Sequence, residues 1–320
     1  MKTINWIRLK DIPVPVLPTL VGFMTLSNIY GSMGFIMIRH ITMILSTFVW
    51  LLYVLKILRH RDVCLEEYSQ TVPGSLHAGF TLSMMLLGSY YVDTVYHLGK
   101  MLWSFGLGLH ILHILVFTYR NVITNRNIVS FVPSWFITYN GIMVSVVVGG
   151  QMNEPIICKI LTYYSIGIYS ILLPIMIYRL VRVPIPKAMV HTQPIILAPC
   201  SLSLVSYFNT MENPNVPLVY ALYLAVFLSV CFVILKLPQF FAFDFTPAFA
   251  GMTFPMAIGT VATGRMVGFL ETQGQLKLMA WLDQFQGFQL YLTTMIIAYV
   301  VLQFLILFTG QKERIRAKYP

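Results

Sequence analysis

Ten long apolar segments make up most of this sequence, and they constrain the fold more than any other feature. They cover residues 15–37, 40–58, 73–92, 98–119, 133–149, 156–178, 193–209, 216–236, 246–264 and 287–309. A helix needs about 20 mainly apolar residues to cross a bilayer. Only 10% of the 320 residues are charged, against about 25% in a soluble domain, and the mean hydropathy is +0.76. We therefore predict an all-α membrane protein with ten transmembrane helices in a single domain, residues 1–320.

Basic residues are distributed unevenly between the two ends of these segments. With ten spans, 16 of the 21 Lys and Arg residues fall on the side that holds both termini. These are Lys2, Arg8, Lys10, Lys56, Arg59, Arg61, Arg120, Arg126, Arg179, Arg182, Lys187, Lys236, Lys312, Arg314, Arg316 and Lys318. The positive-inside rule then predicts a protein of the cell inner (plasma) membrane with both termini in the cytoplasm. The net charge of +10 reflects this topology. A nucleic-acid surface is not expected, because no basic stripe is present.

A proline begins each odd-numbered segment. These prolines are Pro18, Pro73, Pro133, Pro194 and Pro247, at intervals of 55, 60, 61 and 53 residues. Proline suits a first helical turn, where its missing N–H group is not needed. The near-equal spacing predicts five helical hairpins in series, related by quasi-fivefold symmetry.

The odd- and even-numbered segments differ in bulk. Even-numbered segments are bulky, as in ITMILSTFVWLLYVLKIL, whereas odd-numbered segments carry Gly, Ala, Ser and Thr at mid-depth. Two odd-numbered segments hold a second proline, Pro199 and Pro255, which we expect to kink their helices. Irregular backbone is tolerated in a membrane where it is buried in protein or lines an aqueous cavity. We predict an inner ring of odd-numbered helices around a central pore, with the even-numbered helices outside.

Two layers of candidate pore-lining residues follow from counting along the odd-numbered segments. Four residues after each initial proline stand Gly22, His77, Ile137, Ala198 and Gly251. Seven residues after it stand Thr25, Phe80, Asn140, Ser201 and Phe254. If the five repeats superpose, these residues line one path. The alternative is a solid bundle in which they are packing positions, with Thr, Ser and Asn hydrogen-bonded between helices.

Titratable groups are scarce in the odd-numbered segments. A proton relay needs a chain of intramembrane Asp, Glu or His residues, and only His77 is available. It is a relay, a pH sensor or a residue hydrogen-bonded to backbone. His110 and His113 lie one turn apart on the fourth segment, and axial His ligands bind haem iron, so a haem-binding membrane redox protein is an alternative. Since no H-E-x-x-H, G-x-S-x-G or glycine-rich phosphate loop occurs, we expect no enzyme, no metal site and no cofactor.

Two motifs resemble a known family. APCSLSLVSYFN (198–209) and FAGMTFPMAIGTVAT (249–263), within the ten-segment order, resemble the tellurite-resistance/dicarboxylate transporter family. This family includes bacterial anion-channel proteins, fungal malate and sulfite exporters and the plant guard-cell slow anion channel. The resemblance implies homotrimers with one pore in each subunit, formed by five inner helices kinked at mid-membrane. It also implies a phenylalanine on the ninth helix that plugs the pore, and that residue corresponds to Phe254.

The resemblance implies a gated anion channel that conducts small inorganic anions or organic acid anions and is occluded by Phe254. Proton-coupled or facilitated export of C4-dicarboxylate or sulfite is the alternative. Hydroxyls, amides and free N–H groups along the path solvate an anion without trapping it, as conduction requires. The expected partners are the anion, the lipid bilayer and further copies of the chain, and no nucleic acid.

Overall fold

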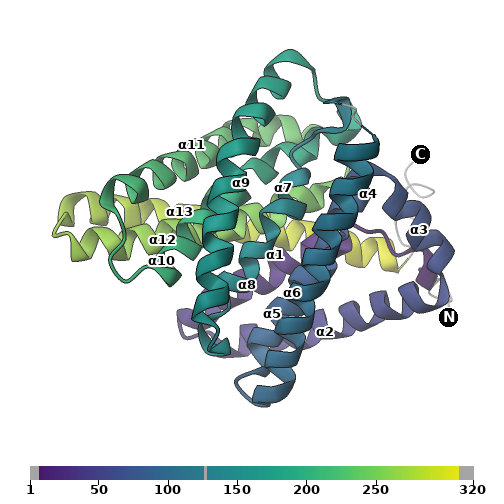
Figure 1. The fold of residues 1–320 in the computed structure, drawn as a ribbon, viewed down its shortest axis with the longest axis horizontal. Coiled ribbons are helices and arrows are strands. Elements are labelled where there is room, and N and C mark those ends of the chain that lie inside the picture. Colours follow the sequence, from purple (N-terminus) through teal and green to yellow (C-terminus); the bar gives the residue numbers. More distant parts are fainter. Residues whose placement is uncertain (1–6, 126–127, 310–320) are drawn as a thin grey trace.

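The computed structural model describes residues 7–125 and 128–309, and every regular element within these ranges is a helix (Figure 1). The predicted all-α fold is therefore confirmed. The orientation prediction rests partly on residues outside the described ranges, namely Lys2, Arg126, Lys312, Arg314, Arg316 and Lys318. The two described ends lie together, because the Ile7 N–H group donates to the Phe308 carbonyl oxygen at 2.9 Å.

Five long helices without a break carry most of the exposed apolar surface, and they correspond to the even-numbered segments. They are α2 (Ile36–Arg59), α6 (Tyr96–Thr118), α9 (Pro155–Arg182), α11 (Val216–Phe241) and α13 (Leu276–Phe308). Only 28–33% of the most apolar stretch of each helix is buried. A helix surface that is both apolar and exposed requires lipid or another subunit as its neighbour.

The odd-numbered segments form buried and mostly interrupted helices. The first is α1 (Val16–Ser32), and the second is divided at His77 into α4 (Thr71–Leu76) and α5 (Ala78–Tyr91). The third consists of α7 (Trp135–Tyr139), the 3-10 helix η4 (Gly141–Met143) and α8 (Val144–Val147). In the fourth and fifth, the 3-10 helices η6 (Lys187–Ile196) and η7 (Pro247–Met252) lead into α10 (Leu197–Thr210) and α12 (Thr253–Thr272).

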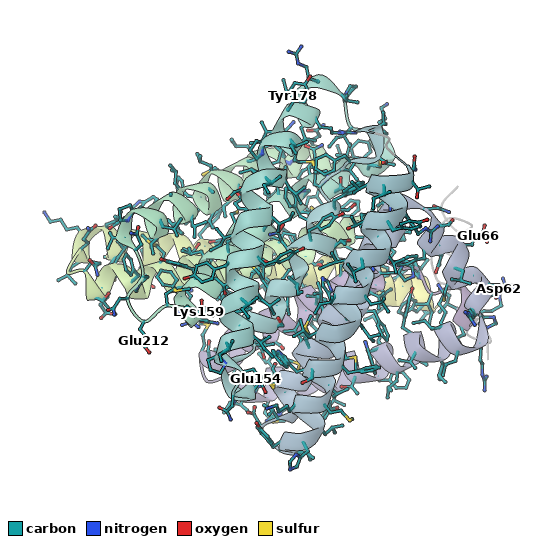
Figure 2. The ribbon with its side chains drawn as sticks, viewed as in Figure 1. Asp62, Glu66, Glu154, Lys159, Tyr178 and Glu212 are labelled. Atoms are coloured by element: carbon teal, nitrogen blue, oxygen red, sulfur yellow. The ribbon has the colours of Figure 1, made fainter. Side chains whose placement is uncertain are left out.

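Short elements complete the described chain. These are η1 (Leu9–Asp11), α3 (Arg61–Ser69), the π-helical turn η2 (Tyr119–Thr124), η3 (Ile128–Ser130) and η5 (Gly150–Met152). Charged side chains gather around them at the ends of the long helices. Asp62 and Glu66 project outward from α3, and Glu212 projects from the turn before α11 (Figure 2). The charges thus lie at the margins of the apolar bundle.

Pro199 and Pro255 occupy equivalent places in their helices. Each is the third residue of an α-helix that follows a 3-10 stretch. The first four N–H groups of a helix have no intrahelical acceptor, so proline is accommodated there without losing a hydrogen bond. The change from 3-10 to α geometry therefore precedes both prolines, and their role as helix kinks stays a prediction.

The buried helices contact one another in a closed cycle. α1 packs on α5, α5 on α8, α8 on α10, α10 on α12 and α12 on α1. Each also packs on the long helix that follows it in the chain, and Figure 1 shows α6 and α9 crossing in front of α5, α7 and α8. Six helices within the described residues are long and apolar enough to cross a membrane, namely the five long helices and Met189–Thr210. Ten spans and fivefold symmetry stay predictions.

Candidate functional site

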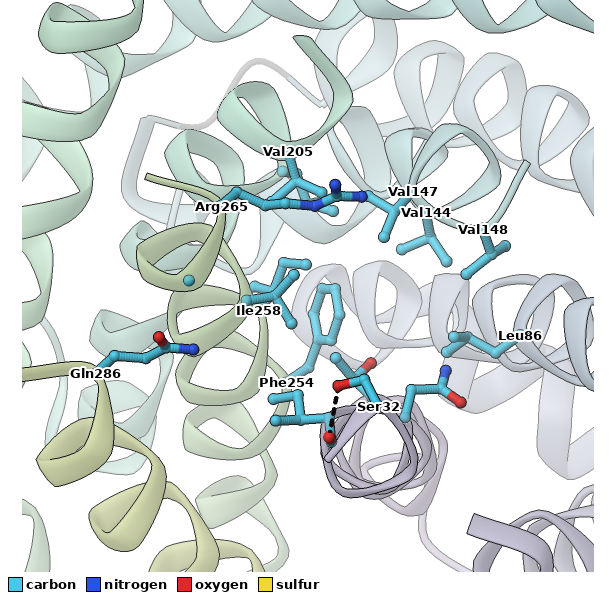
Figure 3. Close-up of a pocket in the computed structure, with 16 residues that line it drawn as sticks. Ser32, Leu86, Val144, Val147, Val148, Val205, Phe254, Ile258, Arg265 and Gln286 are labelled. Atoms are coloured by element: carbon cyan, nitrogen blue, oxygen red, sulfur yellow. Dashed lines mark hydrogen bonds between the residues drawn. The ribbon is translucent and has the colours of Figure 1, made fainter. Parts of the chain in front are cut away.

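A cavity of about 410 Å³ lies inside the cycle of buried helices (Figure 3). We call it the wide cavity. Its walls are mainly aliphatic, with polar groups toward one end. The lining residues are Thr25, Asn28, Ile29 and Ser32 of α1, Leu86 of α5, Val144, Val147 and Val148 at α8, Leu202 and Val205 of α10, Phe254, Ile258, Val261, Gly264 and Arg265 of α12, and Gln286 of α13.

A second cavity, of about 20 Å³, lies on the other side of Phe254. We call it the narrow cavity. It too is lined by all five buried segments, through Pro18, Val21, Leu82, Phe136, Ile137, Gly141, Ile195, Ala198, Leu202, Ala250, Gly251, Phe254 and Pro255. A water molecule needs about 10–15 Å³ of such space, so the narrow cavity has room for about one. Phe254 and Leu202 line both cavities and separate them.

The side chain of Phe254 is held only by apolar packing. It is the second residue of α12 and is 6% exposed, and Figure 3 shows its ring projecting between α1, α5 and α8. Within the described part of the chain, no aromatic ring is paired with it. Phe249, five residues earlier, differs: it is 0% exposed and stacks on His191 with ring centroids 4.0 Å apart. Moving the Phe254 ring therefore breaks dispersion contacts but no aromatic pair.

The backbone beneath Phe254 is fixed by close contact with α1. A Cβ atom on Gly22 would lie 2.6 Å from the Phe254 nitrogen and 2.7 Å from the Thr253 carbonyl carbon. The Thr253 hydroxyl is 3.3 Å from the Pro18 carbonyl oxygen and donates to that of Ala250 at 2.8 Å. Because the main chain cannot shift without separating α1 from α12, the freedom at this position lies in the side chain.

The structure brings some of the predicted pore-lining residues to these cavities. Thr25 lines the wide cavity, and its hydroxyl donates to the Val21 carbonyl oxygen at 2.7 Å. Ala198 and Gly251 line the narrow cavity, together with Ile137. Gly251 also allows close contact with η6, since a Cβ atom there would collide with the His191 carbonyl oxygen.

Other predicted residues lie outside the lining of both cavities. The Ser201 hydroxyl donates to the Leu197 carbonyl oxygen at 2.7 Å, and the Asn140 amide donates to that of Ser165 at 3.0 Å. His77 is hydrogen-bonded through Nδ1 to the Pro73 carbonyl oxygen at 2.9 Å and through Nε2 to the Tyr53 hydroxyl at 3.3 Å. Phe80 stacks on Trp50 of α2, with centroids 5.0 Å apart. That these residues, and Gly22, line a path stays a prediction.

Counting along the repeats gave Phe254 but missed the other three residues of a stripe on α12. Phe254, Ile258, Val261 and Arg265 all line the wide cavity. Their spacing of four, three and four residues places them on one face of an α-helix. This periodicity is visible in the sequence once Phe254 is chosen as the starting point, and Ala198, Leu202 and Val205 repeat it on α10.

His110 and His113 belong to a buried hydrogen-bonded chain. His110 bonds to the Thr81 hydroxyl at 2.7 Å and to the Thr138 carbonyl oxygen at 2.9 Å. His113 bonds to the Tyr68 hydroxyl at 2.9 Å and to the Thr138 hydroxyl at 3.1 Å. Every ring nitrogen of the two histidines is thus engaged, so a haem iron would have to break one of these bonds to be ligated.

Comparison with known proteins identifies related chains. A family model described as voltage-dependent anion channel matches residues 17–310. An uncharacterized transporter of Methanocaldococcus jannaschii is 25% identical over 185 residues, an alignment that covers 53% of this chain and 54% of that protein. The alignment therefore spans about half the length of this relative.

Proposed function

Because the chain belongs to the voltage-dependent anion channel family, as its motifs predicted, we propose that it is a gated anion channel occluded by Phe254. One observation carries the proposal. The Phe254 ring lies between cavities of about 410 and about 20 Å³, and residues of all five buried segments line both. Family membership supports transport of anions rather than enzymatic catalysis.

The closed state follows from the size of the narrow cavity. With room for about one water, an anion at this point must lose most of its hydration shell among aliphatic side chains. Polar groups without hydrogen-bond partners in such surroundings cost several kcal/mol, and unpaired ions cost more. Rotation of the Phe254 ring into the wide cavity would join the two spaces. Exposed side chains change rotamer in picoseconds to nanoseconds, but this ring moves only when packed neighbours such as Leu202 and Ile258 yield.

The proposed assembly has ten spans with quasi-fivefold symmetry, both termini in the cytoplasm and three subunits with separate pores. The closed cycle of contacts among α1, α5, α8, α10 and α12 supports the ring. The exposed apolar faces of the five long helices support a location in the inner membrane beside lipid and further subunits. The native mass of the detergent-solubilised protein tests the trimer, and a mass of one chain contradicts it.

A proton-coupled or facilitated exporter of C4-dicarboxylate or sulfite is the second candidate, and the buried histidine chain favours coupling. Tyr68 on α3 begins this chain, and burial raises the pKa of its hydroxyl to about 12. From Tyr68 the hydrogen bonds lead to His113 and on to the Thr138 hydroxyl, and His110 bonds separately to the Thr138 carbonyl oxygen. His110 lies behind the narrow cavity, since a Cβ atom on Gly141 would be 3.3 Å from its Cε1 atom. Titratable chains of this kind serve proton transfer in transporters.

Anion flux into liposomes separates the candidates. Purified protein is reconstituted, and chloride, nitrate, sulfite and malate are supplied in turn, with and without a proton gradient. A channel gives flux that continues without the gradient and leaves the internal pH unchanged. Flux that requires the gradient or moves protons identifies a coupled carrier. An absorption spectrum with a Soret band would instead favour the haem-binding alternative.

A further inference from the structure

Two arginines lie at the polar end of the wide cavity, and they differ in how their charge is balanced. Arg39 lines an adjoining cavity of about 590 Å³ that shares Asn28, Ser32, Val147 and Val148 with the wide cavity. Its guanidinium donates twice to Asp93 Oδ2, each time at 3.1 Å. Arg265 lines the wide cavity itself and donates to Asn209 Oδ1 at 2.7 Å, which is a neutral acceptor.

The Asn209 amide holds Arg265 in place across the mouth of the cavity. Its Nδ2 group donates to the carbonyl oxygens of Val146 and Val147, at 3.4 and 3.2 Å. This fixes the amide so that its oxygen faces the guanidinium. Figure 3 shows the Arg265 side chain extending from α12 toward Val147. A guanidinium has five N–H donors, and the amide oxygen occupies one end of it.

The charge of Arg265 is therefore available to a ligand. Among the described residues that line the wide cavity, it is the one with a formal charge. Within the described ranges, no carboxylate lies within 4.0 Å of its guanidinium. Arg265 is exposed at the mouth of the cavity, and two charges near a protein surface attract each other at an effective dielectric constant of about 20, well below that of bulk water.

We propose that Arg265 is a docking site for a small anion at the wide cavity, ahead of the Phe254 gate. The inference rests on the proposed channel function. Arg265 is eleven residues after Phe254 on α12, which is about 16 Å along the helix axis at about 1.5 Å per residue. This exceeds the Debye length of about 8 Å at physiological ionic strength. Arg265 therefore raises the anion concentration at the mouth and does not act on the gate directly.

The test measures chloride currents in planar bilayers, with the chloride concentration varied on each face separately. Each substitution is made both in the wild-type chain and in the Phe254→Ala variant. We expect Arg265→Gln to raise the half-saturating chloride concentration about fivefold on the face of the wide cavity and not on the opposite face. Arg265→Lys, which keeps the charge, should stay close to the wild type. The difference between Arg265→Gln and the wild type should vanish near 1 M salt, where the Debye length is about 3 Å.

Two further variants separate docking from general effects. Asn209→Asp puts a carboxylate where the amide oxygen now accepts from Arg265 at 2.7 Å, and it should reproduce the Arg265→Gln result with the arginine still present. Lys277→Gln makes the same charge change at the start of α13, on an exposed residue outside both cavities, and should have no effect.

The outcomes distinguish this inference from the channel proposal. If Arg265→Gln and Asn209→Asp have the same half-saturating chloride concentration as the control Lys277→Gln, the docking role is overturned and the channel proposal stands. Absence of chloride current in both the wild type and the Phe254→Ala variant overturns the channel proposal and the docking role with it.

Discussion

Phe254→Ala should open the path and raise anion flux at least tenfold. The ring now separates the narrow cavity, of about 20 Å³, from the wide cavity, of about 410 Å³. Without it the two spaces join, and an anion keeps water around it as it crosses. Each 1.4 kcal/mol removed from a barrier raises a rate about tenfold. A tenfold rise therefore needs only a small part of the desolvation cost, which is several kcal/mol.

The same substitution should cost little stability. The space left by the ring opens onto the wide cavity, so no closed void remains, and the loss is limited to the burial of the ring, about 1.5–3 kcal/mol. Phe249→Ala is the matched control on the same segment. Phe249 is fully buried and packs against His191, Phe241, Phe245 and Tyr299. Its truncation leaves a closed cavity and should cost about 3–5 kcal/mol, with no gain in flux.

The assay is chloride flux into liposomes that contain equal amounts of each variant, combined with thermal unfolding in detergent. Phe80→Ala is a second control, because Phe80 stacks on Trp50 away from both cavities. It should change the flux less than Phe254→Ala does. The gate assignment is refuted if Phe254→Ala reaches the membrane at wild-type levels and conducts no better than the wild type.

Three further substitutions test other parts of the structure. Gly22→Ala should lower stability by about 1–3 kcal/mol and raise basal flux, because its Cβ atom would press on the Phe254 nitrogen; unchanged melting and flux would contradict this close contact. Glu67→Gln should destabilise the protein by about 3 kcal/mol or less, measured by thermal unfolding, since it leaves the fully buried Lys56 ammonium without the carboxylate that it contacts at 2.7 Å. His113→Phe should leave flux without a proton gradient unchanged if the protein is a channel, and lost proton movement would instead support the coupled carrier.

The two kinds of helix could be predicted from the sequence because they depend on local composition. Bulky apolar residues such as those of α2 and α11 require a lipid-like environment wherever they lie, so the long helices match the even-numbered segments. The interruptions were harder to predict. The segment 133–149 was expected as one helix, but it contains the 3-10 helix η4 and ends as α8 at Val147. Its course depends on tertiary contacts, because a Cβ atom on Gly141 would lie 3.3 Å from Leu82 and His110.

The counted layers assumed equal helix geometry in every repeat, and that assumption explains their mixed placement. A 3-10 helix turns about 120° per residue and an α-helix about 100°. Over the six residues of η7 the difference reaches about 120°. Phe80 and Phe254 share a position in the count, yet one stacks on Trp50 and the other lies between the cavities. Both the count and the family motif singled out Phe254, whereas Arg265, although it lies on the same face of α12, was recognised only from the cavity.

If Phe254 closes the proposed pore, the thinness of this barrier decides where a membrane potential acts. The wide cavity, about 410 Å³, has room for many waters, so it is nearly isopotential with the solution at its mouth. The voltage then falls mainly across the short apolar section around Phe254, and an anion passing it traverses most of the field in one step, worth about 2.3 kcal/mol per 100 mV. The described residues that line this section carry no formal charge. Voltage there drives the permeating ion, while the phenyl ring itself carries no gating charge.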